Sequence, residues 1–207
     1  MDVLLERDKD ELPATWKFAS WADVGLLQGW AEFLGRDSSG GMRDSADFAR
    51  QAVVRWLGYA DKHLTVGSLD EAGQKGLNSD EEFVALLVLK ADLWLNPEHP
   101  LAFVYVRRTW CGGLYLEFMA GHPLAEGSIK GVLRATIQCL SNLAETTGGE
   151  WIWWEATKDS FPKYEGINQG IIAKTNVLSS TEPRVKDLFV VRAAQLQSLL
   201  KQIGRAT

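Results

Sequence analysis

The segment GHPLAEGSIKGVLRATIQCL, residues 121–140, holds residues that could bind an anion. Gly127 and Gly131 lie at the start of a predicted helix that has no acidic residue in its first turns. The free backbone N–H groups and the partial positive charge of a helix start attract phosphate, and Lys130 and Arg134 add positive charge nearby. The segment therefore predicts an anion site, with a tight turn that binds nothing as the alternative.

Glu117 is a candidate for acid-base chemistry because it lies within an otherwise apolar strand-like run, LYLEFMAG. Side chains alternate along a strand, so Tyr115 should share a face with Glu117. Leu116 and Phe118 should then lie together on the other face. A buried carboxylate is costly unless it is paired, so we expect Glu117 to be exposed, partnered or functional.

Other titratable side chains near this segment have simpler alternatives. Glu117 could pair across a hairpin with Arg107 or Arg108. Glu155 has a similar place on the next strand-like run, WIWWEAT, where it could contact a substrate or pair with a neighbour. His122 has no partner visible in the sequence, and we expect a solvated loop histidine.

The C-terminal half must position these residues, and its elements follow the order β-β-α-β-α-β-α. The runs LAFVYVRR and LYLEFMAG flank the short loop TWCGG and predict an antiparallel hairpin. After the hairpin we expect a helix over 127–147, a strand over 151–157, a short helix or turn over 160–166, a strand over 185–191 and a closing helix over 193–203.

The N-terminal half is predicted to be mostly helical. A short strand is expected over 15–20, and apolar residues recur at helical spacing over 21–35 and 46–59. Residues 67–80 have the composition of a glycine-rich polar connection. Over 79–96, a capping signal and the length of the run favour a helix, although its central apolar residues could also form a buried strand.

Composition and charge narrow the possible functions. The share of hydrophobic residues is 46% and that of charged residues 24%, as in ordinary globular proteins. The net charge of −5 divides into −8 over residues 1–100 and +3 over residues 101–207. This asymmetry suits a small anionic ligand in the second half better than a nucleic acid, which usually requires a denser basic stripe.

The sequence predicts no membrane-spanning segment, no metal site and no disulfide. No apolar run reaches the roughly 20 residues that span a bilayer, and the N-terminus lacks the features of a signal peptide, so we expect a cytoplasmic protein. Cys111 and Cys139 are expected to be reduced thiols, and the three histidines show no metal-binding spacing, so no metal site is predicted.

The succession of a strand, a glycine-bearing loop, a long helix, a further strand and then a tyrosine resembles the GNAT-fold acyl-CoA N-acyltransferases. In that family the loop pattern [Gln/Arg]-x-x-Gly-x-[Gly/Ala] opens a helix that binds pyrophosphate. Here Ser128 stands at the Gln/Arg position, Gly131 at the central glycine and Leu133 at the last small position. The runs LYLEFMAGHP and EATKDSFPKY also resemble family segments, and the resemblance covers roughly residues 101–192.

The resemblance implies an α+β fold: a GNAT-like mixed sheet flanked by helices, in a single domain over 1–207. Residues 1–100 would be the variable, mostly helical half and 101–207 the cofactor-binding half. The cofactor would be acetyl-CoA or another acyl-CoA. Its contacts would be Met119, Ala120 and Gly121 with the pantetheine, and Ser128, Ile129, Lys130, Gly131, Val132, Leu133 and Arg134 with the pyrophosphate.

The resemblance also implies a reaction, acyl transfer to a primary amine of a small molecule or a protein. Glu117 would accept the amine proton, and Tyr164 would protonate the departing thiolate. Neither a nucleic acid nor a membrane is an expected partner, and the sequence leaves the assembly state open, a homodimer included.

Two other functions remain open from the sequence. The first is a catalytically silent protein of the same fold that binds a ligand or a protein partner. The second is an unrelated α+β carbohydrate-binding or protein-binding module, which would present Trp151, Trp153 and Trp154 as an exposed aromatic platform.

Overall fold

The computed structural model describes residues 1–78, 81–95, 98–155, 172–174 and 188–195. Its strands are β1 (Asp2–Arg7), β2 (Asp10–Phe18), β3 (Phe83–Lys90), β4 (Ala102–Arg108), β5 (Leu114–Gly121), β6 (Ile129–Lys130), β7 (Trp151–Glu155), β8 (Ile172–Lys174) and β9 (Leu188–Arg192). Its helices are α1 (Trp21–Gln28), α2 (Gly40–Ala60), α3 (Leu69–Asn78) and α4 (Val132–Thr147), with short 3₁₀ turns η1 (Gly29–Phe33), η2 (Pro123–Ala125) and η3 (Ala193–Gln195).

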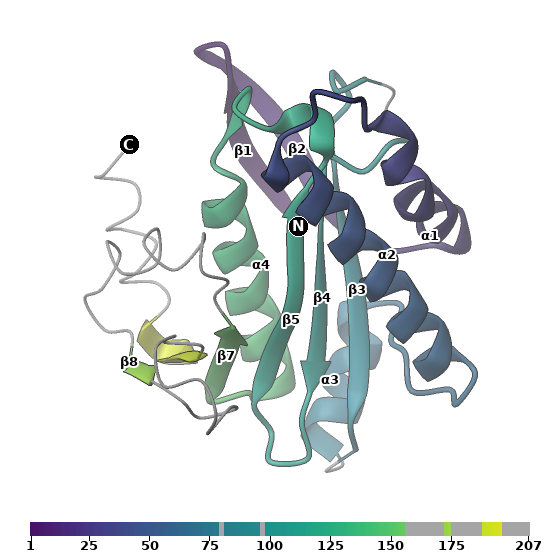
Figure 1. Cartoon of the computed structure of the whole chain (residues 1–207). Helices are drawn as coiled ribbons and strands as arrows, with labels where there is room; N and C mark the ends of the chain where they lie inside the picture. Colours follow the sequence, from purple (N-terminus) through teal and green to yellow (C-terminus); the bar gives the residue numbers. More distant parts are fainter. Residues whose placement is uncertain (79–80, 96–97, 156–171, 175–187, 196–207) are drawn as a thin grey trace.

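The strands form one mixed sheet in the order β6-β1-β2-β3-β4-β5-β7-β9-β8. Neighbouring strands run antiparallel except for β5 and β7, which are parallel. Helices α1 and α2 cover one face of the sheet, and α3 and α4 cover the other (Figure 1). This arrangement confirms the predicted α+β class with a mixed sheet flanked by helices.

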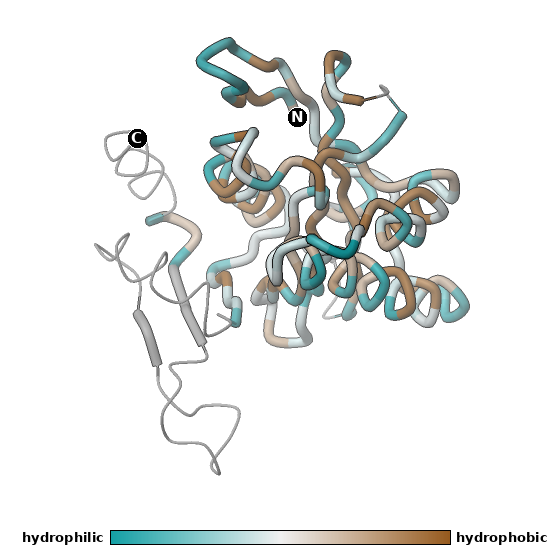
Figure 2. Tube along the Cα trace, turned by 45° about the horizontal axis from the view of Figure 1, so that its top comes forward, coloured by the Kyte–Doolittle hydropathy of each residue, from teal (hydrophilic) through white to brown (hydrophobic). Residues whose placement is uncertain are grey.

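Each face of the sheet has its own hydrophobic core. Val84, Leu86 and Val88 of β3 point towards α1 and α2, whereas the alternate residues Ala85 and Leu87 join the core under α3 and α4. A strand buried on both sides has no polar face, and Figure 2 shows hydrophobic residues concentrated on the central segments. The helix predicted over 79–96 is therefore wrong: its core is strand β3, because an apolar run without polar alternation lacks the periodicity that separates a strand from a helix.

The N-terminal half also contains a hairpin that sequence patterns did not predict. Strands β1 and β2 are joined by Asp8 and Lys9, which have positive φ angles of 52° and 76°. Such two-residue turns usually contain glycine, so ERDKDE carries no recognisable turn signal. Only the last part of β2 was expected, as the short strand over 15–20. The helices expected over 21–35 and 46–59 correspond to α1 with η1, and to α2.

Helix α3 occupies most of the predicted glycine-rich connection, and its glycines serve packing. A Cβ on Gly76 would lie 2.7 Å from the Cβ of Thr147 and 2.9 Å from its backbone, so α3 and α4 approach one another at a glycine. The buried Arg108 donates to the carbonyls of Gly76 (2.8 Å) and Glu81 (3.1 Å), which fixes the end of α3 against β4.

Strand β5 contains an irregularity that changes the predicted pattern of faces. The pairing of β4 with β5 shifts between Tyr105 and Val106, so Tyr105 lies opposite Phe118 and Val106 opposite Leu116. Glu117 is the extra residue of this β-bulge. Leu116 therefore packs in the core under α4, whereas Phe118 packs against the core under α2. The expectation that these two side chains share a face is wrong because of this bulge.

The hairpin predicted over 101–121 is confirmed as β4 and β5, and the strand predicted from residue 151 is confirmed as β7. Helix α4 ends before Gly148 as predicted, but it begins at Val132 and not at residue 127. Ile129 and Lys130 instead form β6, which pairs with β1. The segment predicted over 160–166 lies outside the described residues, as does most of the closing helix predicted over 193–203.

Candidate active site

The predicted anion site lies where β6 passes into α4. Gly131 is the N-cap of α4 and has a φ of 88°, a left-handed conformation that glycine adopts without strain. Within the described part of the chain, no side chain caps this helix start, and its first turn has no acidic residue. The backbone N–H groups of Val132, Leu133 and Arg134 therefore face no internal carboxylate and can receive an anion.

The side chains at this helix start have different surroundings. Arg134 is exposed, and the exposed Lys130 ammonium lies 3.5 Å from the carboxylate of Glu6 on β1. The Ser128 hydroxyl donates to the carbonyl of Ala125 over 3.2 Å. The apolar residues pack partly buried against the core: Ile129, Val132 and Leu133. Charge for an anion is thus available from Arg134 directly and from Lys130 in competition with Glu6.

The loop that leads to this helix start is fixed to α2. The hydroxyl of Ser39, the N-cap of α2, donates a hydrogen bond to the Glu126 carboxylate, and a Cβ added to Gly41 would collide with that carboxylate. A carboxylate at a helix N-terminus is favourable because it meets the positive end of the helix dipole. The loop and α2 therefore hold one another in position.

His122 at the end of β5 is buried, with 1% of its surface exposed, and so the expected solvated histidine is wrong. Its Nδ1 accepts the N–H of Leu124 over 3.1 Å, and its ring packs edge-on against Trp30 and Phe33. Burial, together with the nearby His99, lowers the pKa of His122 to about 4. The imidazole is neutral at pH 7 and acts as a structural cap for η2.

Strands β5 and β7 pair over a short length and then separate. Their register runs from Leu114 opposite Ile152 to Leu116 opposite Trp154. Residues 117–121 of β5 have no strand partner on that side among the described residues. The N–H of His122 bonds towards β4, so by alternation the backbone groups of Met119 and Gly121 point away from β4, into the opening between the two strands.

Glu117 projects from the bulge towards α2 and is held by two arginines. Arg107 on β4 donates its Nε to one carboxylate oxygen over 2.7 Å, and Arg55 on α2 donates to the other. The Glu117 side chain is 6% exposed. The alternative of pairing across the hairpin with Arg107 is thus confirmed, whereas Arg108 is used elsewhere, at the end of α3.

Tyr115 and Glu155 form a second polar pair beside this group. The Tyr115 hydroxyl donates to the Glu155 carboxylate and so bridges β5 and β7. The Arg107 guanidinium lies 5.7 Å from the centre of the Tyr115 ring. Burial and the neighbouring Glu155 raise the pKa of Tyr115, so its hydroxyl remains a donor at pH 7. This places Tyr115 and Glu117 on the same face, as predicted.

Sequence reasoning missed two contributors to this group, Arg55 and the hydroxyl of Tyr115. Arg55 is separated from Glu117 by 62 positions, and an arginine on an amphipathic helix carries no signal of a distant partner. The alternation along β5 and β7 could have paired Tyr115 with Glu155, since both were placed on strands. Tyr164, the predicted general acid, lies outside the described residues.

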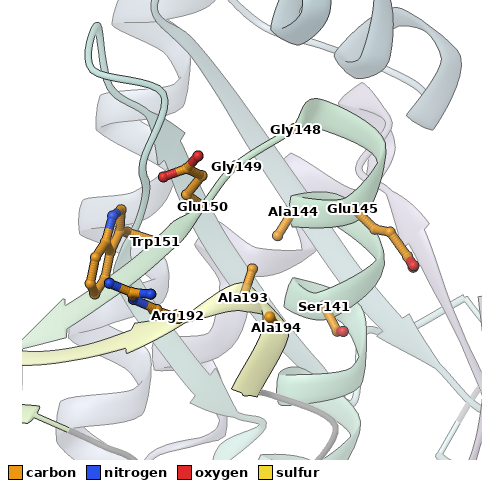
Figure 3. Close-up of a pocket in the computed structure, with 10 residues that line it drawn as sticks. All are labelled: Ser141, Ala144, Glu145, Gly148, Gly149, Glu150, Trp151, Arg192, Ala193 and Ala194. Atoms are coloured by element: carbon orange, nitrogen blue, oxygen red, sulfur yellow. The ribbon is translucent and has the colours of Figure 1, made fainter.

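The tryptophans of β7 do not form the aromatic platform that a carbohydrate-binding or protein-binding module would need. Trp154 is buried, and Trp151 and Trp153 are half-buried. Trp151 lies against the Arg192 guanidinium, 4.9 Å from the ring centre, at the edge of a pocket of about 550 Å³ (Figure 3). This pocket adjoins the C-terminal end of α4, so it is separate from the helix start at Gly131.

The described residues contain no helix that is both long and apolar enough to cross a membrane. They also contain no group of three potential metal ligands. No protein-family model matches the chain, and no curated protein matches it in sequence.

Solved structures do match the fold. A GNAT-family protein from Desulfovibrio desulfuricans superposes with a TM-score of 0.54 at 13% identity, over 87% of this chain and 99% of that one. A chimera of the spermidine N-acetyltransferase SpeG from Vibrio cholerae with hSSAT gives 0.53 at 9% identity, over 89% and 99%. The chain has the GNAT fold.

One similar structure contains a cofactor. The PaiA N-acetyltransferase from Thermoplasma acidophilum, in complex with coenzyme A, gives a TM-score of 0.51 at 9% identity, over 86% of this chain and 98% of that one. Identities this low show a common fold, whereas activity depends on the residues of each site.

Proposed function

We propose that this protein binds acetyl-CoA or another acyl-CoA and transfers the acyl group to a primary amine of a small molecule or a protein. The observation that carries this proposal is the opening between β5 and β7. From the end of β5 the chain continues to the uncapped helix start at Gly131. A GNAT-fold protein of known structure holds coenzyme A, which makes this cofactor class the first to test.

The pyrophosphate would bind at the start of α4. Backbone N–H groups of Val132 to Arg134 supply donors, and the helix dipole favours the negative charge. Arg134 and Lys130 add positive charge, which offsets the absence of the Gln or Arg expected at position 128. Ser128 and Ile129 shape the loop before Gly131, whose left-handed backbone lets the chain turn into the helix.

The pantetheine arm would lie along the free edge of β5. Amide groups of pantetheine can pair with the backbone of Met119 and Gly121 as an added strand would, with Ala120 between them. The thioester would then reach the level of the bulge, beside the point at which β5 and β7 separate. Catalysis at this place would depend mainly on holding thioester and amine together.

The sequence-based roles of Glu117 and Tyr164 remain predictions. Glu117 lies at the bulge, on the face where an acceptor would approach, but proton transfer to it must break a charge-assisted hydrogen bond from Arg55 or Arg107. Tyr164 would supply the proton for the CoA thiolate.

The test is calorimetric titration with CoA and with acetyl-CoA. Arg134→Glu places a carboxylate in the first turn of α4, where it favours the helix but repels pyrophosphate. We expect the variant to bind CoA at least about tenfold more weakly, a loss of about 1.4 kcal/mol. Arg50→Glu, the same change of charge on an exposed turn of α2, is the control and should bind like the wild type.

Failure of the folded wild-type protein to bind CoA would reject the proposal. Equal loss of binding in both charge variants would show a general electrostatic effect and would also count against a site at α4. The catalytically silent alternative is favoured by one observation, the complete engagement of Glu117 by two guanidiniums. That alternative predicts CoA binding without acetylation of any amine.

A further inference from the structure

We infer that Glu155, hydrogen-bonded by Tyr115, binds the ammonium group of the acceptor and takes its proton, whereas Glu117 positions Arg55 and Arg107. The inference rests on the proposed acyl transfer and assigns its acceptor side. The proton acceptor is then Glu155 on β7, and Glu117 on the neighbouring strand β5 is a positioning residue.

The location of Glu155 follows from the register of β5 and β7. The last paired residues are Leu116 and Trp154, so Glu155 is the next residue of β7 at the point of separation. Leu116 and Trp154 both belong to the core under α4. Side chains alternate along a strand, so Glu155 projects to the opposite face, where Tyr115 and Glu117 also lie.

The two carboxylates differ in their partners and exposure. Glu117 is nearly buried and receives hydrogen bonds from two cations. Glu155 is exposed, and its hydrogen-bond donor is the neutral hydroxyl of Tyr115. No ion pair to Glu155 occurs within the described part of the chain, so its negative charge is not compensated by a neighbouring cation there. A cationic amine is therefore attracted to Glu155 and repelled by the arginines around Glu117.

Tyr115 fixes the orientation of Glu155. Its ring lies beside the Arg107 guanidinium, and Arg107 is in turn held by Glu117. The chain of contacts from Arg55 through Glu117, Arg107 and Tyr115 therefore ends at the exposed carboxylate. Glu117 and the two arginines thus position Glu155 through Tyr115, without contacting the amine themselves.

Trp153 adds an aromatic surface next to this carboxylate. It is two residues before Glu155 on the same strand, pairs with Tyr115 in register and is half-buried. An ammonium group beside a carboxylate and an indole ring gains both an ion pair and a cation–π contact. The ligand class that fits this group is a primary alkylammonium.

The proton balance of the step is simple. The Glu155 carboxylate takes one proton from R–NH₃⁺, and the neutral amine nitrogen attacks the thioester carbon. The new C–N bond forms as the C–S bond breaks, and the second proton that the nitrogen loses on becoming an amide neutralises the departing CoA thiolate. Glu155 then returns its proton to water, so the products are the amide, CoA and the regenerated carboxylate.

The experiment is calorimetric titration of CoA-saturated protein with three probes: spermidine, n-butylamine and glycinamide. We expect saturable binding of at least one probe, and an affinity at least about tenfold lower in Glu155→Gln. Glu150→Gln is the matched control, because this exposed carboxylate directly precedes the same strand but lines the separate pocket at the end of α4. It should bind the probe like the wild type.

Tyr115→Phe tests the positioning role separately. It removes only the hydroxyl, and we expect weaker amine binding with unchanged CoA binding; a general structural defect would weaken both. Unchanged amine binding in Glu155→Gln, or no binding of any probe to CoA-loaded protein, would overturn the inference. A protein that does not bind CoA would reject the proposed function instead, and the amine titration without CoA would still decide the role of Glu155.

Discussion

The two faces of the sheet are built on different principles. Under α3 and α4, the contacts are mainly apolar and close: Gly76 of α3 lies directly against Thr147 of α4, and the buried Arg108 donates to backbone carbonyls at the end of α3. Under α2, an apolar core gives way to charged and hydroxylic side chains where β5 meets β7. The closely packed face fixes the shape of the sheet, and the opposite face holds charged groups, which are costly to bury without partners.

The largest expected effect comes from Gly76→Ala on the closely packed face. A new Cβ there would contact both the side chain and the backbone of Thr147, and backbone atoms cannot move aside cheaply. We expect a loss of about 3 kcal/mol in the free energy of unfolding, measured by urea denaturation.

Gly58→Ala on α2 is the matched control for this change. A Cβ on Gly58 meets no atom within 4 Å, so the better helix propensity of alanine should stabilise the protein by about 0.5–1 kcal/mol. Similar effects of the two substitutions would contradict the difference between the faces.

The second effect concerns His122 at the end of β5. Its pKa falls from 6.5 to about 4 on folding, so the unfolded chain binds the proton more readily. The stability that depends on neutral His122 is complete above pH 6.5 and is lost as the pH falls towards 4. At pH 5 the loss should be about 2 kcal/mol relative to pH 7.5.

Urea unfolding at pH 7.5 and pH 5.0 measures this loss. His122→Asn retains an acceptor for the N–H of Leu124 but does not titrate, so the difference between the two pH values should shrink by the same amount. An equal pH dependence in both proteins would show that His122 is not the group responsible.

The smallest effect tests the polar group under α2. Glu117→Gln leaves Arg107 and Arg55 without a charged partner, and we expect the free energy of unfolding to fall by about 1.5 kcal/mol. The control is Asp47→Asn, which removes the exposed pair with Arg50 and should cost about 0.5 kcal/mol or less. Equal costs would mean that burial does not strengthen the Glu117 pairs.

The parts of the fold that could be predicted are those with local signals. The hairpin of β4 and β5 has β-branched residues around a glycine loop, and α4 ends at a glycine in the left-handed conformation. Strand β3 could not be separated from a helix, because both of its faces are covered and its polar alternation is absent. The hairpin at Asp8 and Lys9 lacked the glycine that marks most such turns.

The candidate site likewise contains residues that local sequence signals identify and residues that depend on tertiary packing. Gly131 was recognisable because a helix start without an acidic residue is a local property of the sequence. Of the two partners of Glu117, Arg107 could be predicted because it lies across the hairpin. Arg55 could not, because it comes from a helix whose position depends on tertiary packing. The burial of His122 also depends on distant residues, Trp30 and Phe33.

The bulge at Glu117 has a consequence for how this chain can change in length. Because one extra residue separates Leu116 from Phe118, the last part of β5 has its inward and outward positions exchanged relative to the first part. Deleting Glu117 would place Leu116 directly before Phe118, so the strand would alternate regularly and Met119 and Ala120 would keep both their faces and their partners on β4. We expect natural variants one residue shorter at this point to keep the sheet and to lose the carboxylate that holds Arg55 and Arg107.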